Sequence, residues 1–404
     1  MKKYFLGFLL FISQFSVAQI IVKGNVSSNK IPLEGAAIYL NNSSIGTTSD
    51  SDGNFELTVR EGSYDLIISY LGYKTISYPL VTSAYNGPLV FNLNEDDNRL
   101  DEIVIRKTVY DNVWRYNLDE FKRTFIGSSS LAKDCEILNP KVLHFEFDSK
   151  NVILEAFAKE PLRIKHKSLG YLITYDLVSY KLNQNMVTYL GYTKYETLKG
   201  GRSKKRKWNN NRLKAYRGSR VHFFKSLIEK KLKSEGYIVN QFKRKRNPER
   251  PSDQEIKSAR ALIRQTRVID LNTKKPAPPK SAIDSALSIL RKSRLPEFID
   301  YLYKRNVPYE EIFREKEGKT YLTFENYLSI IYTREKEDIN YLQNFSREKR
   351  APGPQTSSIV ILNKYPYLEL SGLVINPLDI FYEGYWGFEK IAETLPLDYN
   401  PNLD

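Results

Sequence analysis

The chain has 404 residues, of which 41% are hydrophobic and 13% aromatic, so it is too apolar to remain without a folded core. Its length is enough for roughly two or three domains. Lysine and arginine number 62 against 47 aspartate and glutamate, and the resulting net charge of +15 favours an anionic partner. One cysteine and three histidines exclude an internal disulfide and leave carboxylates as the main ligands of any metal site.

Residues 1–18 have the pattern of a secretory signal peptide. Lys2 and Lys3 precede an apolar run, and Ser16 and Ala18 supply small residues before a cut after Ala18. The run is shorter than the roughly 20 residues that cross a bilayer, and no later run is long enough for a transmembrane helix. We therefore expect an exported protein that is periplasmic or associated with the outer membrane of a Gram-negative envelope.

The charge is unevenly distributed along the chain. Residues 19–106 hold six Lys or Arg and eleven Asp or Glu, a net charge of −5. Residues 107–404 hold 54 basic and 36 acidic residues, a net charge of +18. This change coincides with an acidic turn at 95–98, so we predict a domain at 19–94, a linker at 95–106 and a basic domain at 107–404.

The segment 19–94 predicts an antiparallel β-sandwich. Short apolar runs alternate with Gly, Asn and Asp turn residues, a pattern typical of such folds. The sequence Asp52-Gly53 predicts a hairpin turn, because glycine accepts the positive φ of a tight turn. The expected strands are 20–26, 36–40, 55–59, 64–70 and 89–93.

A set of residues in this segment carries a family resemblance. The motifs are Val22-x-Gly24-x-Val26, Pro32-Leu33-x-Gly35-Ala36-x-Ile38, Gly46-Thr47-Thr48-x-Asp50-x-Asp52-Gly53-x-Phe55, Gly62-x-Tyr64 and Ser69-Tyr70-x-Gly72-Tyr73. They resemble the carboxypeptidase regulatory-like domain. The resemblance implies a transthyretin-like sandwich of about seven strands, found beside metallocarboxypeptidases and at the front of TonB-coupled receptors. It implies no catalysis in itself.

Motifs for catalysis or metal binding are weak. A zinc carboxypeptidase holds its metal through His-x-x-Glu, and none of His144, His166 and His222 has Glu at that offset. Cys135, with His144 nearby in sequence, is more typical of a small core residue than of a nucleophile. We therefore assign no catalytic residue, no metal site and no cofactor.

The basic region 107–404 predicts an antiparallel sheet with amphipathic helices, so the fold class is mainly β or α+β. Helical spacing between Trp208 and Lys233 is interrupted near Gly218. The Pro-rich stretch 247–280 predicts an irregular connector with a modest helix or strand, and 386–394 a short helix. Strand-like runs fall at 121–125, 131–138, 142–147, 152–158, 162–166, 171–182, 186–198, 320–333, 357–362 and 367–370.

Two clusters of cations are candidate contacts to an anionic surface. They are Arg202, Lys204, Lys205, Arg206 and Lys207, followed by Trp208, and Lys243, Arg244, Lys245 and Arg246. The sequence pattern alone favours the interpretation that both clusters are simply solvated loops, with contact to an anionic surface as the alternative. Behind a signal peptide, anionic lipids or other envelope polymers are the expected partners, rather than nucleic acid.

The remaining motifs of the basic region resemble exported bacterial proteins described as carboxypeptidase-like regulatory domain-containing proteins. Among them are Leu169-Gly170-Tyr171, Ala215-Tyr216-x-Gly218-Ser219 and Gly384-Tyr385-Trp386. We expect a non-enzymatic envelope protein that binds a protein, a glycan or an anionic membrane surface. Two alternatives stay open: a hydrolase of envelope polymers that uses carboxylates such as Glu146, Asp148 and Glu155, and a small outer-membrane β-barrel.

Overall fold

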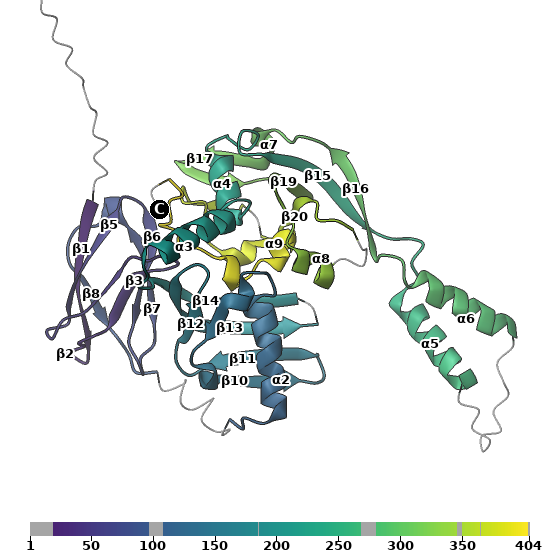
Figure 1. Ribbon diagram of the computed structural model, residues 1–404, viewed down its shortest axis with the longest axis horizontal. Helices are drawn as coiled ribbons and strands as arrows, with labels where there is room; N and C mark the ends of the chain where they lie inside the picture. The colour runs from purple at the N-terminus through teal and green to yellow at the C-terminus, as the bar shows by residue number, and fades with distance from the viewer. Residues whose placement is uncertain are drawn as a thin grey trace, which may run out of the picture. The chain divides into compact units, whose positions relative to one another are not determined.

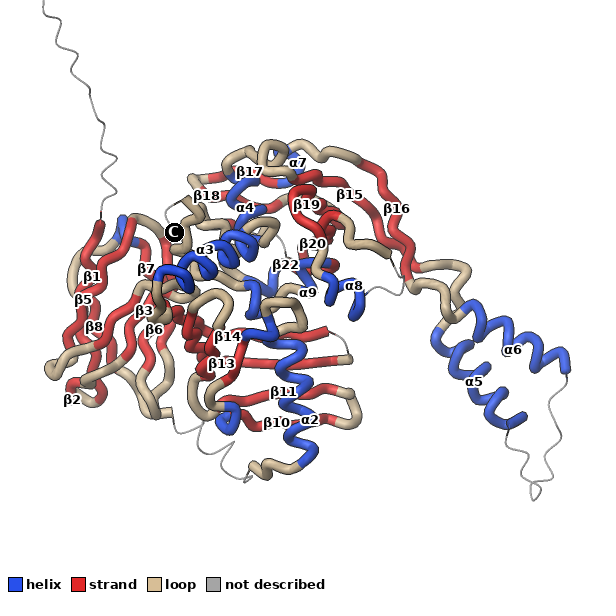
Figure 2. The backbone as a smooth tube through the Cα atoms, in the orientation of Figure 1, coloured by secondary structure: helices blue, strands red, loops and turns tan. Residues whose placement is uncertain are grey.

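The computed structural model describes residues 19–96, 108–184, 186–267, 280–345, 350–363 and 365–402 (Figures 1 and 2). The predicted signal peptide and most of the predicted linker lie outside these residues. The chain divides into two compact units: unit 1 comprises residues 1–219, 338–351 and 388–404, and unit 2 comprises residues 220–337 and 352–387. Within the described ranges, several antiparallel sheets and eight α-helices confirm the predicted class, mainly β or α+β.

Two four-stranded sheets at the start of unit 1 form the predicted sandwich around one hydrophobic core. Strict alternation along one strand places Phe55, Leu57 and Val59 in this core and polar neighbours in solvent. One sheet contains β1 (Gln19–Ser28), β2 (Ile31–Pro32), β5 (Asn54–Arg60) and β8 (Leu89–Asn92). The other contains β3 (Ala37–Leu40), β4 (Gly46–Thr48), β6 (Ser63–Ser69) and β7 (Ile76–Val81). In contrast to the antiparallel prediction, β1 and β8 pair in parallel.

A six-stranded antiparallel sheet forms the second part of unit 1. Its long strand β13 pairs with β14 along one side and with β12 and then β11 along the other. The strands are β9 (Cys135–Ile137), β10 (Leu143–Asp148), β11 (Ile153–Ala158), β12 (Leu162–His166), β13 (Tyr171–Asn183) and β14 (Met186–Thr197). Helix α3 (Arg202–Tyr216) follows, and α8 (Ile339–Phe345) and the 3₁₀ turn η6 (Ile391–Glu393) complete the unit.

The prediction of a strand at 121–125 is wrong. This segment is the end of α2 (Asn112–Phe121) and the π-helical turn η2 (Lys122–Ile126) that continues it. The Asp111 carboxylate caps α2 by accepting a hydrogen bond from the Trp114 amide at 2.9 Å. Apolar residues at helical spacing, Leu118, Phe121 and Phe125, then enter the core.

Unit 2 has a separate aromatic core, so the region predicted as one basic domain contains two cores among its described residues. Phe223 of α4 (Arg220–Ile228) contacts Trp386 of α9 (Tyr385–Phe388), with ring centroids 5.3 Å apart. The five-stranded sheet has the order β16 (Phe298–Lys304), β15 (Tyr237–Arg246), β19 (Tyr327–Lys336), β20 (Pro354–Ile361) and β22 (Ile380–Gly384). A smaller sheet contains β17 (Phe313–Lys316), β18 (Lys319–Leu322) and β21 (Tyr367–Leu368), next to α7 (Tyr309–Ile312).

The predicted connector 247–280 contributes one of the two helices of a helical hairpin. Helices α5 (Asp253–Arg267) and α6 (Lys280–Lys292) lie side by side, and the cluster of prolines at 276–279 falls between them, outside the described residues. In Figure 1 the hairpin continues from the ends of β15 and β16. The connector is therefore more helical than its proline content suggests.

The sandwich is joined to β14 by main-chain hydrogen bonds within unit 1. The Asn42 amide donates to the Thr193 carbonyl at 2.8 Å, and the Tyr195 amide donates to the Ser43 carbonyl at 2.9 Å. The loop after β3 thus adds a short bridge to the edge of the six-stranded sheet. This pairing couples the sandwich to the sheet independently of the linker.

Asp398 closes the same junction, because its carboxylate accepts hydrogen bonds from the Ser44 amide at 2.7 Å and from the Ser44 hydroxyl. We expect Asp398→Ala to lower the free energy of unfolding by about 1–2 kcal/mol, since both donors lose a charged acceptor. Amide hydrogen exchange at residues 42–44 should accelerate. The exposed Asp52 of the same sandwich is the control, and equal exchange in the Asp398→Ala and Asp52→Ala variants would contradict the coupling.

Candidate functional site

Helix α3 carries the first predicted cation cluster and is anchored by three side chains near its middle. Trp208, Asn211 and Arg212 donate hydrogen bonds to the carbonyls of residues 167, 168 and 169 at 2.9, 2.9 and 2.8 Å. The Arg212 guanidinium also lies 4.0 Å from the centre of the Tyr171 ring. These bonds fix the helix on the turn between β12 and β13.

The first half of α3 projects its cations into solvent. Every residue from 202 to 207 is exposed, and the ion pairs found among the described residues include none of the five cations there. Gly201 at the N-cap offers no capping side chain, and the first turn has no acidic residue. The cations are Arg202, Lys204, Lys205, Arg206 and Lys207.

This arrangement is electrostatically unfavourable in the free protein. Cations three or four positions apart, such as Arg202 and Arg206, lie next to each other on a helix and repel. The positive end of the helix dipole adds to the repulsion. A bound external anion would offset both the repulsion between neighbouring cations and the repulsion from the helix dipole. The beginning of α3 therefore has the positive charge and the exposure that contact with an anion requires.

The second predicted cluster lies on β15, in unit 2, and its members have different roles. Arg244 is partly buried and forms ion pairs with Asp300 at 2.8 Å and Glu383 at 2.7 Å. The hydrogen bond to Asp300 is the main cause that raises the pKa of Arg244, so this cation is a structural one. Lys243 and Lys245 are exposed, as is Arg246.

The exposed lysines of β15 lie over aromatic rings of β16, which the sequence analysis did not assign to a site. The Lys243 ammonium is 5.4 Å from the centre of the Tyr303 ring, and that of Lys245 is 5.9 Å from the Tyr301 ring. The sequence signal that could have identified these rings is the alternation of tyrosines within a strand-like run. Both predicted clusters therefore lie on regular elements, a helix and a strand, and not on loops, and apart from Arg244 their cations are exposed to solvent.

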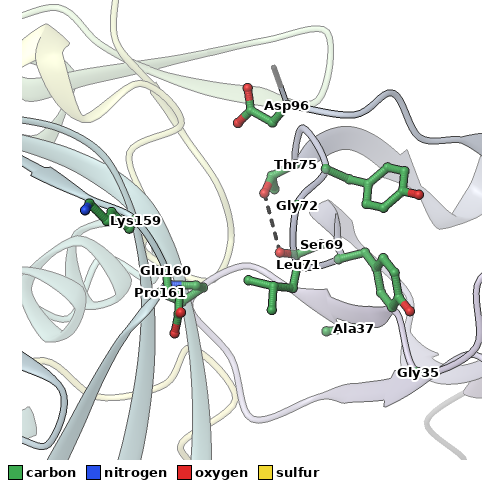
Figure 3. Close-up of a pocket in the computed structure, with 12 residues that line it drawn as sticks. Gly35, Ala37, Ser69, Leu71, Gly72, Thr75, Asp96, Lys159, Glu160 and Pro161 are labelled. Atoms are coloured by element: carbon green, nitrogen blue, oxygen red, sulfur yellow. Dashed lines mark hydrogen bonds between the residues drawn. The ribbon is translucent and has the colours of Figure 1, made fainter. Parts of the chain in front are cut away.

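A cavity of ≈ 580 Å³ in unit 1 lies between loops of the sandwich and residues 159–161 (Figure 3). Its lining includes Lys159 and Glu160, which carry opposite charges. The Thr75 hydroxyl donates a hydrogen bond to Asp176 at 2.7 Å and lies 3.4 Å from the Ser69 hydroxyl, a contact drawn in Figure 3. Its lining contains none of the nine predicted cations, so its mixed charge gives no preference for an anion.

The carboxylates of the hydrolase alternative lie on β10 and β11 and not in this cavity. Glu146 and Glu155 are opposite each other in the strand register, and Glu155 pairs with Lys181 at 2.7 Å. Hydrogen bonds from Asn151 and Lys150 lower the pKa of Asp148. A general acid needs a raised pKa, whereas the pKa of Asp148 is lowered. Asp148 is therefore better suited to stabilise the turn after β10 through these hydrogen bonds.

Cys135 is not activated as a nucleophile, because burial raises the pKa of its thiol well above the usual range. In the described parts of the chain, no three His, Cys, Asp or Glu side chains gather closely enough to hold a metal ion.

Comparison with known proteins identifies the sandwich. Residues 22–105 match the family model of the CarboxypepD_reg-like domain, and this segment of the chain is such a domain. The TonB-dependent receptor SusC of Bacteroides thetaiotaomicron is 32% identical over 100 residues, which are 24% of this chain and 9% of the receptor. The TonB-dependent receptor P3 of Formosa agariphila is 35% identical over 108 residues, 26% of this chain and 10% of the receptor.

The chain thus matches only about a tenth of the length of these curated relatives. Their similarity concerns a segment the size of the sandwich. Among the residues that the structure describes, no helix combines the length and the apolar character that crossing a membrane requires.

Proposed function

We propose that this protein is a non-enzymatic binding protein of the Gram-negative cell envelope, exported by its N-terminal segment, and that its basic surface holds an anionic lipid or glycan. The CarboxypepD_reg-like domain and the similarity to TonB-dependent receptors support the location. The sandwich serves as a docking module that is fixed to the basic part by its bridge to β14.

The observation that carries the proposal is the exposed cation cluster at the beginning of α3, for which the described part of the chain supplies no ion pair. Five cations within six residues repel each other and the helix dipole, while Trp208, Asn211 and Arg212 hold the helix in place. Exposed cations on a helix that is held in place are suited to bind phosphate or carboxylate groups on an extended surface.

Binding of the full chain to vesicles tests the proposal. We expect Lys204→Gln, Lys205→Gln and Lys207→Gln together to weaken binding to vesicles of phosphatidylcholine and phosphatidylglycerol by roughly 100-fold, because each cation near an anionic surface contributes about 1 kcal/mol. Cosedimentation over a range of lipid concentration gives the affinities.

The matched control removes the same number of charges from exposed positions of the acidic sandwich, as Lys30→Gln, Arg60→Gln and Lys74→Gln. This variant should bind as the unmodified chain does. Equal loss in both triple variants would assign binding to net charge alone, and no loss in the α3 variant would remove α3 from the contact.

A further inference from the structure

Half of the net positive charge of residues 107–404 lies in one segment of unit 2. Residues 243–304 hold 16 Lys or Arg and seven Asp or Glu, a net charge of +9. The described part of this segment is a two-stranded ribbon, formed by the second half of β15 and by β16, together with the hairpin of α5 and α6. We call it the basic arm.

The ribbon and the hairpin are continuous. The Asn247 amide donates to the Glu297 carbonyl at 2.8 Å, and the Asn247 side chain donates to the Pro296 carbonyl at 3.0 Å. These bonds close the ribbon where the helices begin. Figures 1 and 2 show the hairpin beyond the end of the ribbon, away from the other strands of the sheet of unit 2.

One face of the ribbon is fixed to the body of unit 2. Arg244 lies on this face, 4.6 Å from the centre of the Tyr327 ring, and pairs with both Asp300 and Glu383. Glu383 belongs to β22, which two strands separate from β15 in the sheet order, so the sheet curls around Arg244. The ribbon is therefore held in a defined position.

The opposite face presents lysine and tyrosine to solvent. Lys243 and Lys245 alternate along β15, and Tyr301 and Tyr303 are each 47% exposed on the edge strand β16. No further strand pairs with the outer edge of β16 in the described residues. These four residues form a ladder in which each ammonium lies over a ring.

The hairpin adds an apolar side chain within a cationic surface. Ile256, Ala259 and Ala286 are buried, while Leu287 remains 51% exposed. Exposed cations surround this small interior on both helices: Lys257, Arg260, Arg264, Lys280, Arg291 and Lys292. An amphipathic helix with a strongly basic polar face is typical of segments that lie in a membrane interface.

From these observations we infer that the basic arm lies on an anionic lipid surface, with Lys243 and Lys245 at the phosphates and Tyr301, Tyr303 and Leu287 at the boundary between headgroups and acyl chains. Tyrosine prefers this depth because its ring is apolar and its hydroxyl is polar. The inference rests on the proposed function for the anionic partner and adds a second, inserting contact to that of α3.

Charge complementarity alone would also fit an acidic glycan. The side chain of Leu287, which is 51% exposed, favours lipid. Aliphatic side chains gain free energy when they leave water for an acyl environment, whereas a hydrated polysaccharide offers them little.

An environment-sensitive fluorophore on Leu287→Cys of the full chain tests the insertion. The native thiol of Cys135 is partly buried and has a raised pKa, so the introduced thiol reacts first. Vesicles of phosphatidylcholine with phosphatidylglycerol should shift the emission to shorter wavelength. In the double variant Lys243→Gln and Lys245→Gln, a roughly 30-fold higher lipid concentration should be needed for half of the shift.

The control pair Lys316→Gln and Lys319→Gln removes two exposed lysines of unit 2, one of which also lies over a tyrosine ring, and should leave the shift unchanged. Vesicle binding without a shift would overturn the inserting arm and leave the proposed function standing. Absence of binding both to vesicles and to soluble polygalacturonate would overturn both. A shift produced by soluble polygalacturonate but not by vesicles would assign the arm to a glycan and overturn the lipid contact.

Discussion

Replacing Trp208 with alanine is expected to lower the free energy of unfolding of unit 1 by about 3–5 kcal/mol, the usual cost of truncating a large buried aromatic side chain. The indole is 6% exposed and donates to the Lys167 carbonyl at 2.9 Å. A Cβ added at Gly170 or Gly200 would come within 2.2 or 2.5 Å of the ring, so the two glycines make room for it. Chemical unfolding followed by circular dichroism measures the loss.

The variant Trp208→Phe is the control for this prediction. It retains most of the buried ring but loses the indole N–H, so a smaller loss of about 1–2 kcal/mol is expected. Amide exchange along α3 should accelerate in the alanine variant and much less in the phenylalanine variant. A loss below about 1 kcal/mol for Trp208→Ala would show that the beginning of α3 is held by other contacts.

The second large effect concerns Glu393, whose carboxylate ties the turn η6 to the segment around Ser129 in unit 1. It accepts hydrogen bonds from the Ser129 hydroxyl and from the Lys390 amide, the latter at 2.9 Å. Burial, reinforced by the nearby Asp338, raises its pKa to about 7. Glu393 is therefore a carboxyl group that changes charge near neutral pH.

Because the pKa of Glu393 is higher in the folded protein than its ordinary value, the proton stabilises the fold. This contribution is complete below the ordinary carboxyl pKa and is lost as the pH rises through about 7. We expect unit 1 to lose about 2 kcal/mol of unfolding free energy between about pH 5.5 and about pH 8 from this group.

Denaturant unfolding at both pH values, with Trp114 and Trp208 as probes in unit 1, measures this change. Glu393→Gln should remove the pH-dependent part, whereas Glu34→Gln, at an exposed position of the sandwich, should retain it. If the glutamine variant shows the same pH dependence as the unmodified chain, another group is responsible for it.

The sandwich was predictable because its signals are local. Alternation over 55–59, the Asp52-Gly53 turn and the spacing of the apolar runs specify strands without knowledge of distant contacts, and β3, β5, β6 and β8 fall where they were expected. The parallel pairing of β1 with β8 was not predictable in this way. It depends on which strands become neighbours across 60 residues of chain, and no turn specifies it.

The candidate site was predictable as a set of charges and not as a geometry. Exposure of the cluster on α3 follows from its density of charge, and whether it holds an anion stays a prediction. Arg244 could not be separated from Lys243 and Lys245, because its partner Glu383 is 139 positions away. The docking of Ser44 on Asp398, 354 positions apart, likewise has no signature in either segment alone.

Binding of the full chain to vesicles of phosphatidylcholine with and without phosphatidylglycerol, measured as the salt concentration is raised, is the most direct test of the central claim. We predict binding that requires phosphatidylglycerol and weakens with salt, because exposed charges are screened. No binding at low salt, or equal binding to both kinds of vesicle at every salt concentration, would contradict the assignment of the basic surface to an anionic lipid.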